Sequence, residues 1–284
     1  MHEVTNRYHW RRSFLEALRL LAQASARLPF SVPDPVLYGD AAVELYTGSL
    51  WSAATLDVIC ANARQLTAEL FVAGFRWSDR PRHVARGLWH ADLQIGVDII
   101  EALEPPSAAE QVNWLWVAVD LEPSVPGNDS YLKAIGIEDL IVRQAGYWIG
   151  DGAARGEVAT RLSALVGLAR QGVCGPLRTG YLRRRLAREA HEDVVIGWIP
   201  GDESWAQSVA PRTMSLTEMH ARIDVWRDRN GLLPAALNAG EQGRLGDANR
   251  RTQVRNNAPS GRGRTEGSSA KILPFDVAIS ILPE

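Results

Sequence analysis

The chain has 284 residues, of which 46% are hydrophobic and 23% are charged, the balance of an ordinary globular protein. Its formal net charge of −2 gives no global reason to expect nucleic acid or an acidic membrane as a partner, so any such contact must come from a local patch. No stretch approaches the roughly 18 uninterrupted apolar residues of a membrane-spanning helix, and the N-terminus lacks the apolar core of a secretion signal. The cysteines, Cys60 and Cys174, are far apart in sequence and have no metal-ligand spacing. We expect each to be a small buried hydrophobic side chain and not half of a disulfide, which fits a reducing cytoplasm.

The N-terminal part predicts a helix and then an extended connection. Residues 9–28 place apolar side chains at helical spacing, with most of the arginines off that stripe. We expect the stripe to pack on the edge of a sheet, and the alternative is a basic face that meets a polyanion. Residues 28–35 are rich in proline, which is typical of an extended connection.

Residues 35–60 are the stretch around which the chain is organised. A short apolar strand stops at Gly39, Asp40 is expected to cap the following helix, and residues 55–60 predict a second strand that carries Asp57. A glycine turn at a helix N-terminus and a neighbouring carboxylate suit a phosphate-and-metal site. An ordinary strand–helix–strand unit with an aspartate on the surface is the alternative.

The middle of the chain alternates helix and strand patterns. Residues 62–73 predict a helix capped by Asn62. Residues 95–101 predict a strand, and alternation puts Asp98 on the face opposite to Glu101. A solvent-side carboxylate is the alternative to a functional role for Asp98. Residues 112–122 are apolar enough for a central strand.

The C-terminal half predicts mostly helix. A helix begins at Glu138 with acidic residues in its first turn, which suits the helix dipole, and residues 155–171 and 177–190 predict two more. The last of these carries a dense basic face, which indicates either a solvated helix surface or a contact with a polyanion such as RNA. The candidates for this contact are Arg183, Arg184 and Arg185.

The stretch from residue 35 to residue 60 resembles the opening motif of nucleotidyltransferase-fold proteins, the superfamily that includes DNA polymerase beta. It is most similar to small bacterial nucleotidyltransferase-like proteins and abortive-infection toxins. Their pattern is a strand ending in Gly-Gly or Gly-Ser, a helix, and a strand carrying Asp-x-Asp. Gly39 matches the first glycine, Asp40 takes the second position, and Thr55-Leu56-Asp57 lies where Asp-x-Asp is expected, so one acid is missing. The resemblance covers about residues 30–190.

The resemblance implies a set of site residues. Asp57 and Asp98 would be the catalytic and metal-binding acids, with Glu101 as the second choice for the acid on the neighbouring strand, and the metal would be Mg²⁺. Gly39, Asp40 and Thr55 would line the nucleotide site. Thr55 cannot supply the missing charge, and the charge of Asp40 would oppose a phosphate at the helix N-terminus unless Asp40 itself faces the metal.

A second sequence motif of the family follows about eighty residues after the first. The small nucleotidyltransferase-like proteins have a short strand, then Glu-Asp-Leu-Ile, then a helix, and residues 138–141 match it. In the family a basic residue a few positions on approaches the triphosphate, and Arg143 is the nearest match here.

The implied fold class is α/β (α+β): a nucleotidyltransferase-like mixed sheet flanked by helices, with a helical C-terminal part and a disordered tail. In the helical extension we expect a helix over residues 214–233, with Ser215 as its N-cap and Glu218 completing a capping box. The tail is rich in Gly, Asn, Arg and Ser, which is typical of disorder. The predicted division is 1–29 N-terminal helix, 30–200 nucleotidyltransferase-like domain, 201–239 helical extension, and 240–284 disordered tail.

Three functions are open at this point. The first is Mg²⁺-dependent transfer of an NMP from an NTP to an RNA or protein acceptor in a bacterial cytoplasm, with a link to toxin–antitoxin systems and a cognate partner protein. The second is a catalytically degenerate member of the same fold that acts as a binding or scaffold module. The third is a hydrolase, which no Ser-His-Asp, Cys-His, Walker lysine or H-E-x-x-H pattern supports.

Overall fold

A computed structural model describes residues 10–77, 87–101, 113–119, 131–150, 155–195, 197 and 212–232. The chain divides into two compact units, residues 1–226 and residues 227–284. In the second unit the structure describes residues 227–232, which complete a helix and a turn. The predicted tail, residues 240–284, lies outside the described residues, so its disorder stays a prediction.

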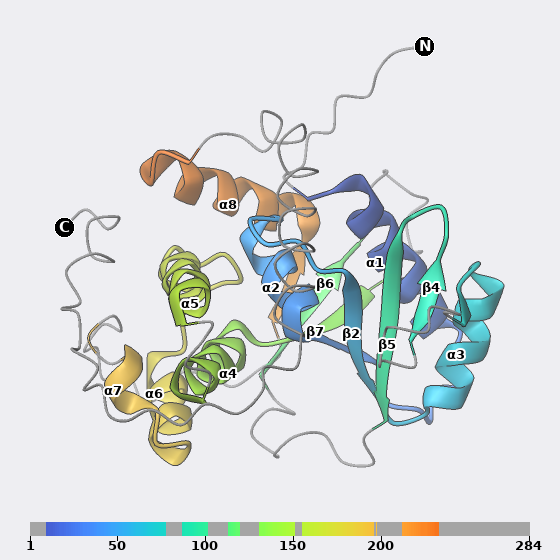
Figure 1. The fold of residues 1–284 in the computed structure, drawn as a ribbon, viewed down its shortest axis with the longest axis horizontal. Coiled ribbons are helices and arrows are strands. Elements are labelled where there is room, and N and C mark those ends of the chain that lie inside the picture. Colours follow the sequence, from blue (N-terminus) through green and yellow to red (C-terminus); the bar gives the residue numbers. More distant parts are fainter. Residues whose placement is uncertain are drawn as a thin grey trace, which may run out of the picture. The chain divides into compact units, whose positions relative to one another are not determined.

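The described residues form helices and strands in a mixed order along the chain (Figure 1). The helices are α1 Arg12–Ala26, α2 Gly39–Thr47, α3 Ala63–Val72, α4 Ile137–Gly150, α5 Arg155–Arg170, α6 Thr179–Arg188, α7 Glu192–Val195 and α8 Leu216–Arg229. The strands are β1 Val36–Tyr38, β2 Thr55–Cys60, β3 Arg76–Trp77, β4 Leu88–His90, β5 Ile95–Glu101, β6 Trp114–Ala118, β7 Tyr131–Ile135 and β8 Arg212–Ser215.

The described strands belong to one mixed sheet in the order β3-β4-β5-β2-β1-β7-β6-β8. Strand β1 is antiparallel to β2 and parallel to β7, while β2 is parallel to β5. The predicted α/β class with a mixed sheet is therefore confirmed. The first strand–helix–strand unit lies at the centre of this sheet, so the residues that it carries are flanked by strands on both sides.

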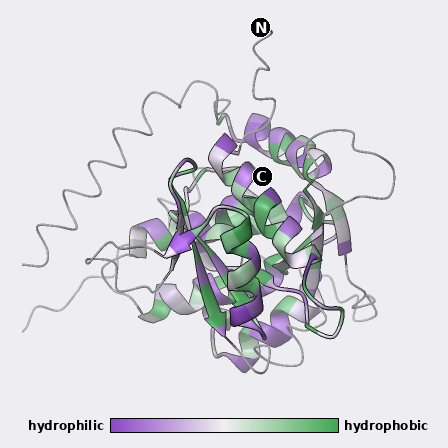
Figure 2. Cartoon of the chain, turned by 90° about the vertical axis from the view of Figure 1, so that its right-hand side faces the viewer, coloured by the Kyte–Doolittle hydropathy of each residue, from purple (hydrophilic) through white to green (hydrophobic). Residues whose placement is uncertain are grey.

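One face of the sheet is largely buried. It is formed by alternate residues such as Leu56, Val58 and Val97, each with 0% of its surface exposed. Helix α1 packs against α3, β5 and β7, and α3 packs against β5. Both helices present apolar side chains to the core and polar ones to solvent, and their ribbons mix green and purple accordingly (Figure 2). The predicted apolar stripe of α1 packs on the sheet, but against the interior strands β5 and β7 and not on an edge of the sheet as predicted.

The opposite face of the sheet is only partly covered. Thr55, Asp57 and Ile59 alternate with the buried residues of β2 and are half-buried, and Ile100 on β5 is 49% exposed. Helices α4, α5 and α6 lie together on the left of Figure 1, and α2 packs against β2, α4 and α5. The half-buried face therefore has a helical cluster beside it rather than a helix layer over all of it.

Local end signals were predicted well at two helices and wrongly at a third. Asn62 accepts a hydrogen bond from the backbone N–H of Gln65 at 3.1 Å, and Ser215 accepts one from Glu218 at 3.1 Å, so both predicted N-caps are confirmed. The predicted cap at Asp40 is wrong, because α2 begins at Gly39 and Asp40 lies in its first turn. The side chain of Asp40 is instead held by a distant arginine, which no local pattern indicates.

Two strands extend beyond the sequence-based expectation. Strand β7 takes up residues 131–135, and β8 takes up residues 212–215 directly before α8, including two residues that were predicted to be helical. Both strands pair with β6, which brings the C-terminal helical part to the sheet. Cys60 and Cys174 are buried free thiols, as predicted. Among the described helices, none combines the length and the apolar character that crossing a membrane requires.

Candidate functional site

The turn between β1 and α2 brings the backbone very close to Asp57. Gly39 has φ +58°, and a β-carbon at this position would lie 2.2 Å from Oδ2 of Asp57. A larger residue would therefore be strained by its backbone conformation and would also clash with the carboxylate. The backbone N–H of Asp40, at the start of α2, donates to Oδ2 of Asp57 at 3.3 Å. Glycine is needed at position 39 because the N-terminus of α2 lies in close contact with the Asp57 carboxylate.

Asp57 and Asp98 lie side by side on the half-buried face of the sheet. They are register partners on the parallel strands β2 and β5, so their side chains point to the same face. Gly87 makes room for the second acid, since a β-carbon there would lie 2.0 Å from Oδ1 of Asp98. The sequence alone predicted both residues, and the structure brings them together.

The carboxyl of Asp57 holds its proton more tightly than an ordinary aspartate. Burial raises the pKa of Asp57 to about 6, and the nearby charges of Asp40 and Asp98 contribute to the rise. The hydroxyl of Thr55 donates to Oδ1 of Asp57 at 3.3 Å, which opposes the shift only in part. Thr55 thus orients the carboxylate but adds no charge of its own.

Asp40 and Arg161 form an ion pair beside the acids. Nη1 of Arg161 lies 2.8 Å from Oδ1 of Asp40, and Nη2 lies 2.7 Å from Oε1 of Glu157, one turn earlier on α5. Sequence reasoning missed Arg161, although its spacing from Glu157 is that of a helical ion pair. The arginine reaches the N-terminus of α2 and partly neutralises the negative charge there.

Arg143 also lies on the site side of the sheet. Its guanidinium stacks over the ring of Tyr38, with the Cζ atom 3.9 Å from the ring centroid. Tyr38 is the register partner of Asp57 across β1 and β2, so both side chains point to the same face. The predicted candidate Arg143 is therefore placed next to the acids by α4, and the sheet register accounts for this.

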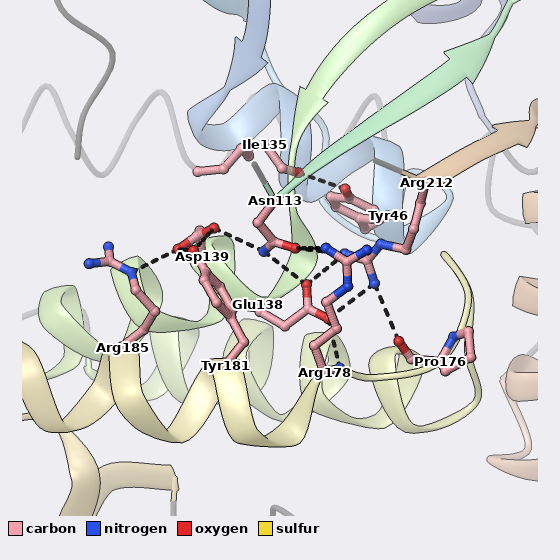
Figure 3. Close-up of polar contacts among 10 residues, drawn as sticks. All are labelled: Tyr46, Asn113, Ile135, Glu138, Asp139, Pro176, Arg178, Tyr181, Arg185 and Arg212. Carbon is pink, nitrogen blue, oxygen red and sulfur yellow. Dashed lines mark hydrogen bonds and ion pairs between the residues drawn. The ribbon is translucent and has the colours of Figure 1, made fainter. Parts of the chain in front are cut away.

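A second acid pair, Glu138 and Asp139, is buried at the start of α4 (Figure 3). Glu138 accepts two hydrogen bonds from the guanidinium of Arg212, at 2.6 and 3.0 Å, and a third from the backbone N–H of Arg178 at 3.0 Å. Burial by itself would raise the pKa of Glu138, but the ion pair with Arg212 and these hydrogen bonds lower it below its ordinary value. This acid is charged and neutralised inside the protein.

Asp139 belongs to the same network. It accepts hydrogen bonds from Asn113 at 2.9 Å, from the hydroxyl of Tyr181 at 2.8 Å and from Nε of Arg185 at 2.9 Å (Figure 3). The network joins β6, α4, α6 and β8. Glu138 and Asp139 match the Glu-Asp of the family motif. In this structure they hold four elements together around the first turn of α4.

The predicted basic face of α6 is divided by this network. Arg185 is only 6% exposed and is bonded to Asp139 and Glu189, so it is not available to a polyanion in the described structure. Arg183 and Arg184 take part in other interactions of the described residues, and a contact with a polyanion through them stays a prediction. Sequence reasoning missed the burial because the partner acid lies on a different helix.

Within the described ranges, no group of three or more histidine, cysteine, aspartate or glutamate side chains is arranged to hold a metal ion. Asp57 and Asp98 are therefore a two-carboxylate donor set. Mg²⁺ is commonly bound by one or two carboxylates together with substrate phosphates, so the pair fits a cation that arrives with a nucleotide better than a resident metal.

Comparison with known proteins places only distant structures beside this chain. The sequence matches no protein-family model and no curated protein. The antibiotic-resistance factor ANT(2'')-Ia is similar in structure, with 14% identity over 63% of this chain and 97% of its own, at a TM-score of 0.36. JHP933 from Helicobacter pylori is similar with 16% identity over 86% of this chain and 99% of its own, also at a TM-score of 0.36. Because both scores are low, the function is inferred below from the geometry of the site.

Proposed function

We propose that this protein is a nucleotidyltransferase that uses Mg²⁺ to transfer an NMP from an NTP to an acceptor. The observation that carries the proposal is the placement of Asp57 and Asp98, register partners on one face of the sheet and next to the N-terminus of α2. In the transfer, an acceptor oxygen bonds to the α-phosphorus, the bond to the bridging oxygen breaks, pyrophosphate leaves, and the acceptor proton passes to water.

Asp57 and Asp98 would hold the cation. Their side chains share one face. Burial raises the pKa of Asp57, the charges of Asp40 and Asp98 add to the rise, and a divalent cation would relieve both effects. When bound, Mg²⁺ neutralises charge on the phosphates of the nucleotide. Thr55 would keep one carboxylate oriented, since its hydroxyl bonds to Oδ1 of Asp57.

Two arginines would contact the phosphates. Arg161 lies at the N-terminus of α2, and Arg143 is held over Tyr38 on the same face as the acids. Guanidinium groups bind phosphate oxygens through paired hydrogen bonds. Nη1 of Arg161 already donates to the Asp40 carboxylate, whose negative charge would repel a phosphate placed beside it. Nucleotide binding and the Asp40–Arg161 pair therefore compete.

The second candidate is a catalytically degenerate protein of the same fold that binds a nucleotide or a partner without transfer. It is favoured by Thr55, which stands where a further acid is expected, and by Asp40, whose carboxylate lies at the first turn of α2. Both features reduce the means of holding a cation and a phosphate together. The two candidates predict the same binding site and differ in whether a label moves to an acceptor.

Thermal unfolding of the full chain with each NTP, in Mg²⁺ and in EDTA, tests binding. A ligand that binds only the folded state raises the melting temperature by mass action, so we expect a Mg²⁺-dependent rise with at least one NTP. The rise should be lost in Asp57→Asn and Asp98→Asn and kept in Asp92→Asn, since Asp92 is an exposed acid just before β5. A shift that survives EDTA and Asp57→Asn contradicts the proposed site.

Transfer is tested with an α-phosphate-labelled NTP and a mixture of RNA and protein acceptors. Covalent label that depends on Mg²⁺ and on Asp57 supports the enzyme. Mg²⁺-dependent binding with no transfer to any acceptor supports the degenerate alternative. No shift with any NTP overturns the enzyme and favours a degenerate protein that binds a partner instead of a nucleotide.

A further inference from the structure

A row of side chains runs across the half-buried face of the sheet, one step along the strands from the acid pair. The register places these residues side by side, in an order that continues from strand to strand. Ile100 on β5 neighbours Ile59 on β2, which neighbours Val36, Lys133 and Trp116 in turn, and the row ends at Thr213 on β8.

The part of this row on β6 and β7 is aromatic and cationic. Nζ of Lys133 lies 4.8 Å from the ring centroid of Trp114 and 5.4 Å from that of Trp116. Tyr131, two residues before Lys133, points to the same face and is 40% exposed. We call Trp114, Trp116, Tyr131 and Lys133 the Trp–Lys platform. Trp114 is buried and serves as its base, while Trp116 and Lys133 are half-buried.

The platform and the acid pair share one face of one rigid sheet. Lys133 is two strands from Asp57, because β1 lies between β2 and β7. With strands about 5 Å apart and about 3.3 Å of rise per residue, the two side chains are roughly 10 Å apart across the sheet and about 7 Å apart along it. A chain of two or three nucleotides spans such a distance.

We propose that the acceptor is a single-stranded nucleic acid, whose reacting end lies at the acid pair and whose preceding nucleotides lie on the Trp–Lys platform. This inference rests on the proposed function for the identity of the reacting end, but binding to the platform does not depend on catalysis. A base would stack on Trp116 or Tyr131, and the backbone phosphate next to it would lie near Lys133.

The chemistry of the platform favours this ligand over a protein segment. Proteins that bind single strands combine a cationic track for the backbone with aromatic rings on which bases stack. Here Lys133 and Arg143, two cations among the described residues of this face, are each held against an aromatic ring. An apolar protein segment would find a lysine in the middle of the surface, with the exposed carboxylate of Asp34 near it.

The binding experiment uses the full chain and fluorescently labelled single-stranded oligonucleotides, RNA and DNA of the same sequence, with binding followed by anisotropy over a range of salt. We expect RNA or DNA to bind, and Lys133→Gln to weaken binding and to reduce the salt slope by about one phosphate contact. Trp116→Leu should weaken binding about 5- to 100-fold, whereas Trp116→Phe should keep most of it because it keeps a ring for stacking.

The controls separate stacking from folding. Arg64→Gln removes an exposed cation on α3, which packs on the other face of the sheet, and should leave binding unchanged. Thermal melts of each variant must match the unmutated protein, and Trp116→Phe gives a folded comparison if Trp116→Leu unfolds. If the Trp116→Leu, Trp116→Phe and Lys133→Gln variants all bind the oligonucleotides as tightly as the unmutated protein does, the proposal is overturned.

The outcome is independent of the nucleotide test. Oligonucleotide binding that depends on the platform, with no Mg²⁺-dependent NTP binding, supports the inference and overturns the proposed function. NTP binding with no oligonucleotide binding at low salt supports the proposed function and overturns the inference. The acceptor is then a protein or a small molecule.

Discussion

Each of the two acid pairs of this protein consists of two carboxylates, but the surroundings of the two pairs are opposite. Glu138 and Asp139 are fully buried, and three arginines, an asparagine and a tyrosine bond to them or to each other around them. Asp57 and Asp98 lie on a half-buried sheet face. Among the described residues, Asp57 accepts hydrogen bonds from a backbone N–H and a hydroxyl and forms no ion pair with an arginine or lysine.

The difference separates a structural role from a binding role. A buried acid that is already neutralised by arginine has its charge used inside the protein, where it holds elements together. Burial raises the pKa of Asp139 as well as that of Asp57, but Asp139 is paired with Arg185. Asp57, with a pKa of about 6, forms no ion pair with an arginine or lysine among the described residues and is kept at a cost in stability, which is typical of functional sites. The first pair therefore organises α4, and the second is the pair that a cation and a phosphate can reach.

The largest effect is expected when the buried pair is broken from the arginine side. Arg212→Met leaves the Glu138 carboxylate buried without its bidentate partner, and we expect a loss of about 3–5 kcal/mol in the free energy of unfolding. Urea unfolding followed by circular dichroism measures it. The matched variant Arg64→Met, at an exposed arginine, should change stability by less than about 0.5 kcal/mol. A loss of similar size in both variants would show that Arg212 is not a network residue.

Removing one hydrogen bond from the same network should have a smaller effect. Tyr181→Phe deletes the hydroxyl that donates to both oxygens of Asp139 at 2.8 Å, and we expect a loss of about 1–2 kcal/mol in the free energy of unfolding. Tyr147→Phe is the control, because Tyr147 is 50% exposed, and it should unfold at the same denaturant concentration as the unmutated protein. Identical midpoints for the two variants would contradict the prediction.

At Asp57, removing the charge should raise the free energy of unfolding, whereas the changes in the buried pair should lower it. The folded-state pKa of Asp57 is about 6 against an ordinary value of 3.8, so between these values the folded chain keeps a proton that the unfolded chain has released. Stability attributable to this group is therefore lost as pH rises from about 4 to 6 and does not return above 6.

Asp57→Asn should remove this loss. Because the group is partly exposed, we discount the shift for solvent screening and expect a gain of about 1 kcal/mol at pH 7.5 and little change at pH 4. Denaturant unfolding at a series of pH values measures the gain. A variant that is less stable than the unmutated protein at pH 7.5 would show that Asp57 is a structural acid like Glu138.

The smallest effect is expected at the exposed ion pair. Asp40→Asn breaks a contact in which the Asp40 side chain is 60% exposed, so the free energy of unfolding should change by no more than about 0.5 kcal/mol. Removing this charge should also lower the pKa of Asp57, since Asp40 contributes to its rise. An NMR titration of the Asp57 carboxyl carbon measures the pKa, and an unchanged value would exclude the coupling.

Local sequence patterns correctly predicted the features that depend only on residues close together in the sequence. The strand that ends at Gly39, the strand that carries Asp57 and the caps at Asn62 and Ser215 follow from residues within a few positions of one another, so they could be found without the fold. The choice of Asp98 came from the family resemblance and strand alternation. Alternation sets the two faces of a strand but not which strand lies beside it.

Only the tertiary structure decided the partners. Arg161 and Asp40 are 121 residues apart, and Arg212 and Glu138 are 74 residues apart, so their pairing depends on how α5 and β8 dock. Asp40 is not the cap because α2 begins at Gly39, and the docking of α5 gives its carboxylate an arginine partner. The docking of α6 on α4 buries Arg185 against Asp139 in the same way. By itself the sequence determined which residues carry charge and indicated most helices and the strands around Asp57 and Asp98, but it did not indicate β8, which takes up the start of a segment predicted as helix. The register of β2 with β5, and of β7 with β6, decided that two acids meet and that a lysine lies between two tryptophans, because register is set by packing across the whole sheet.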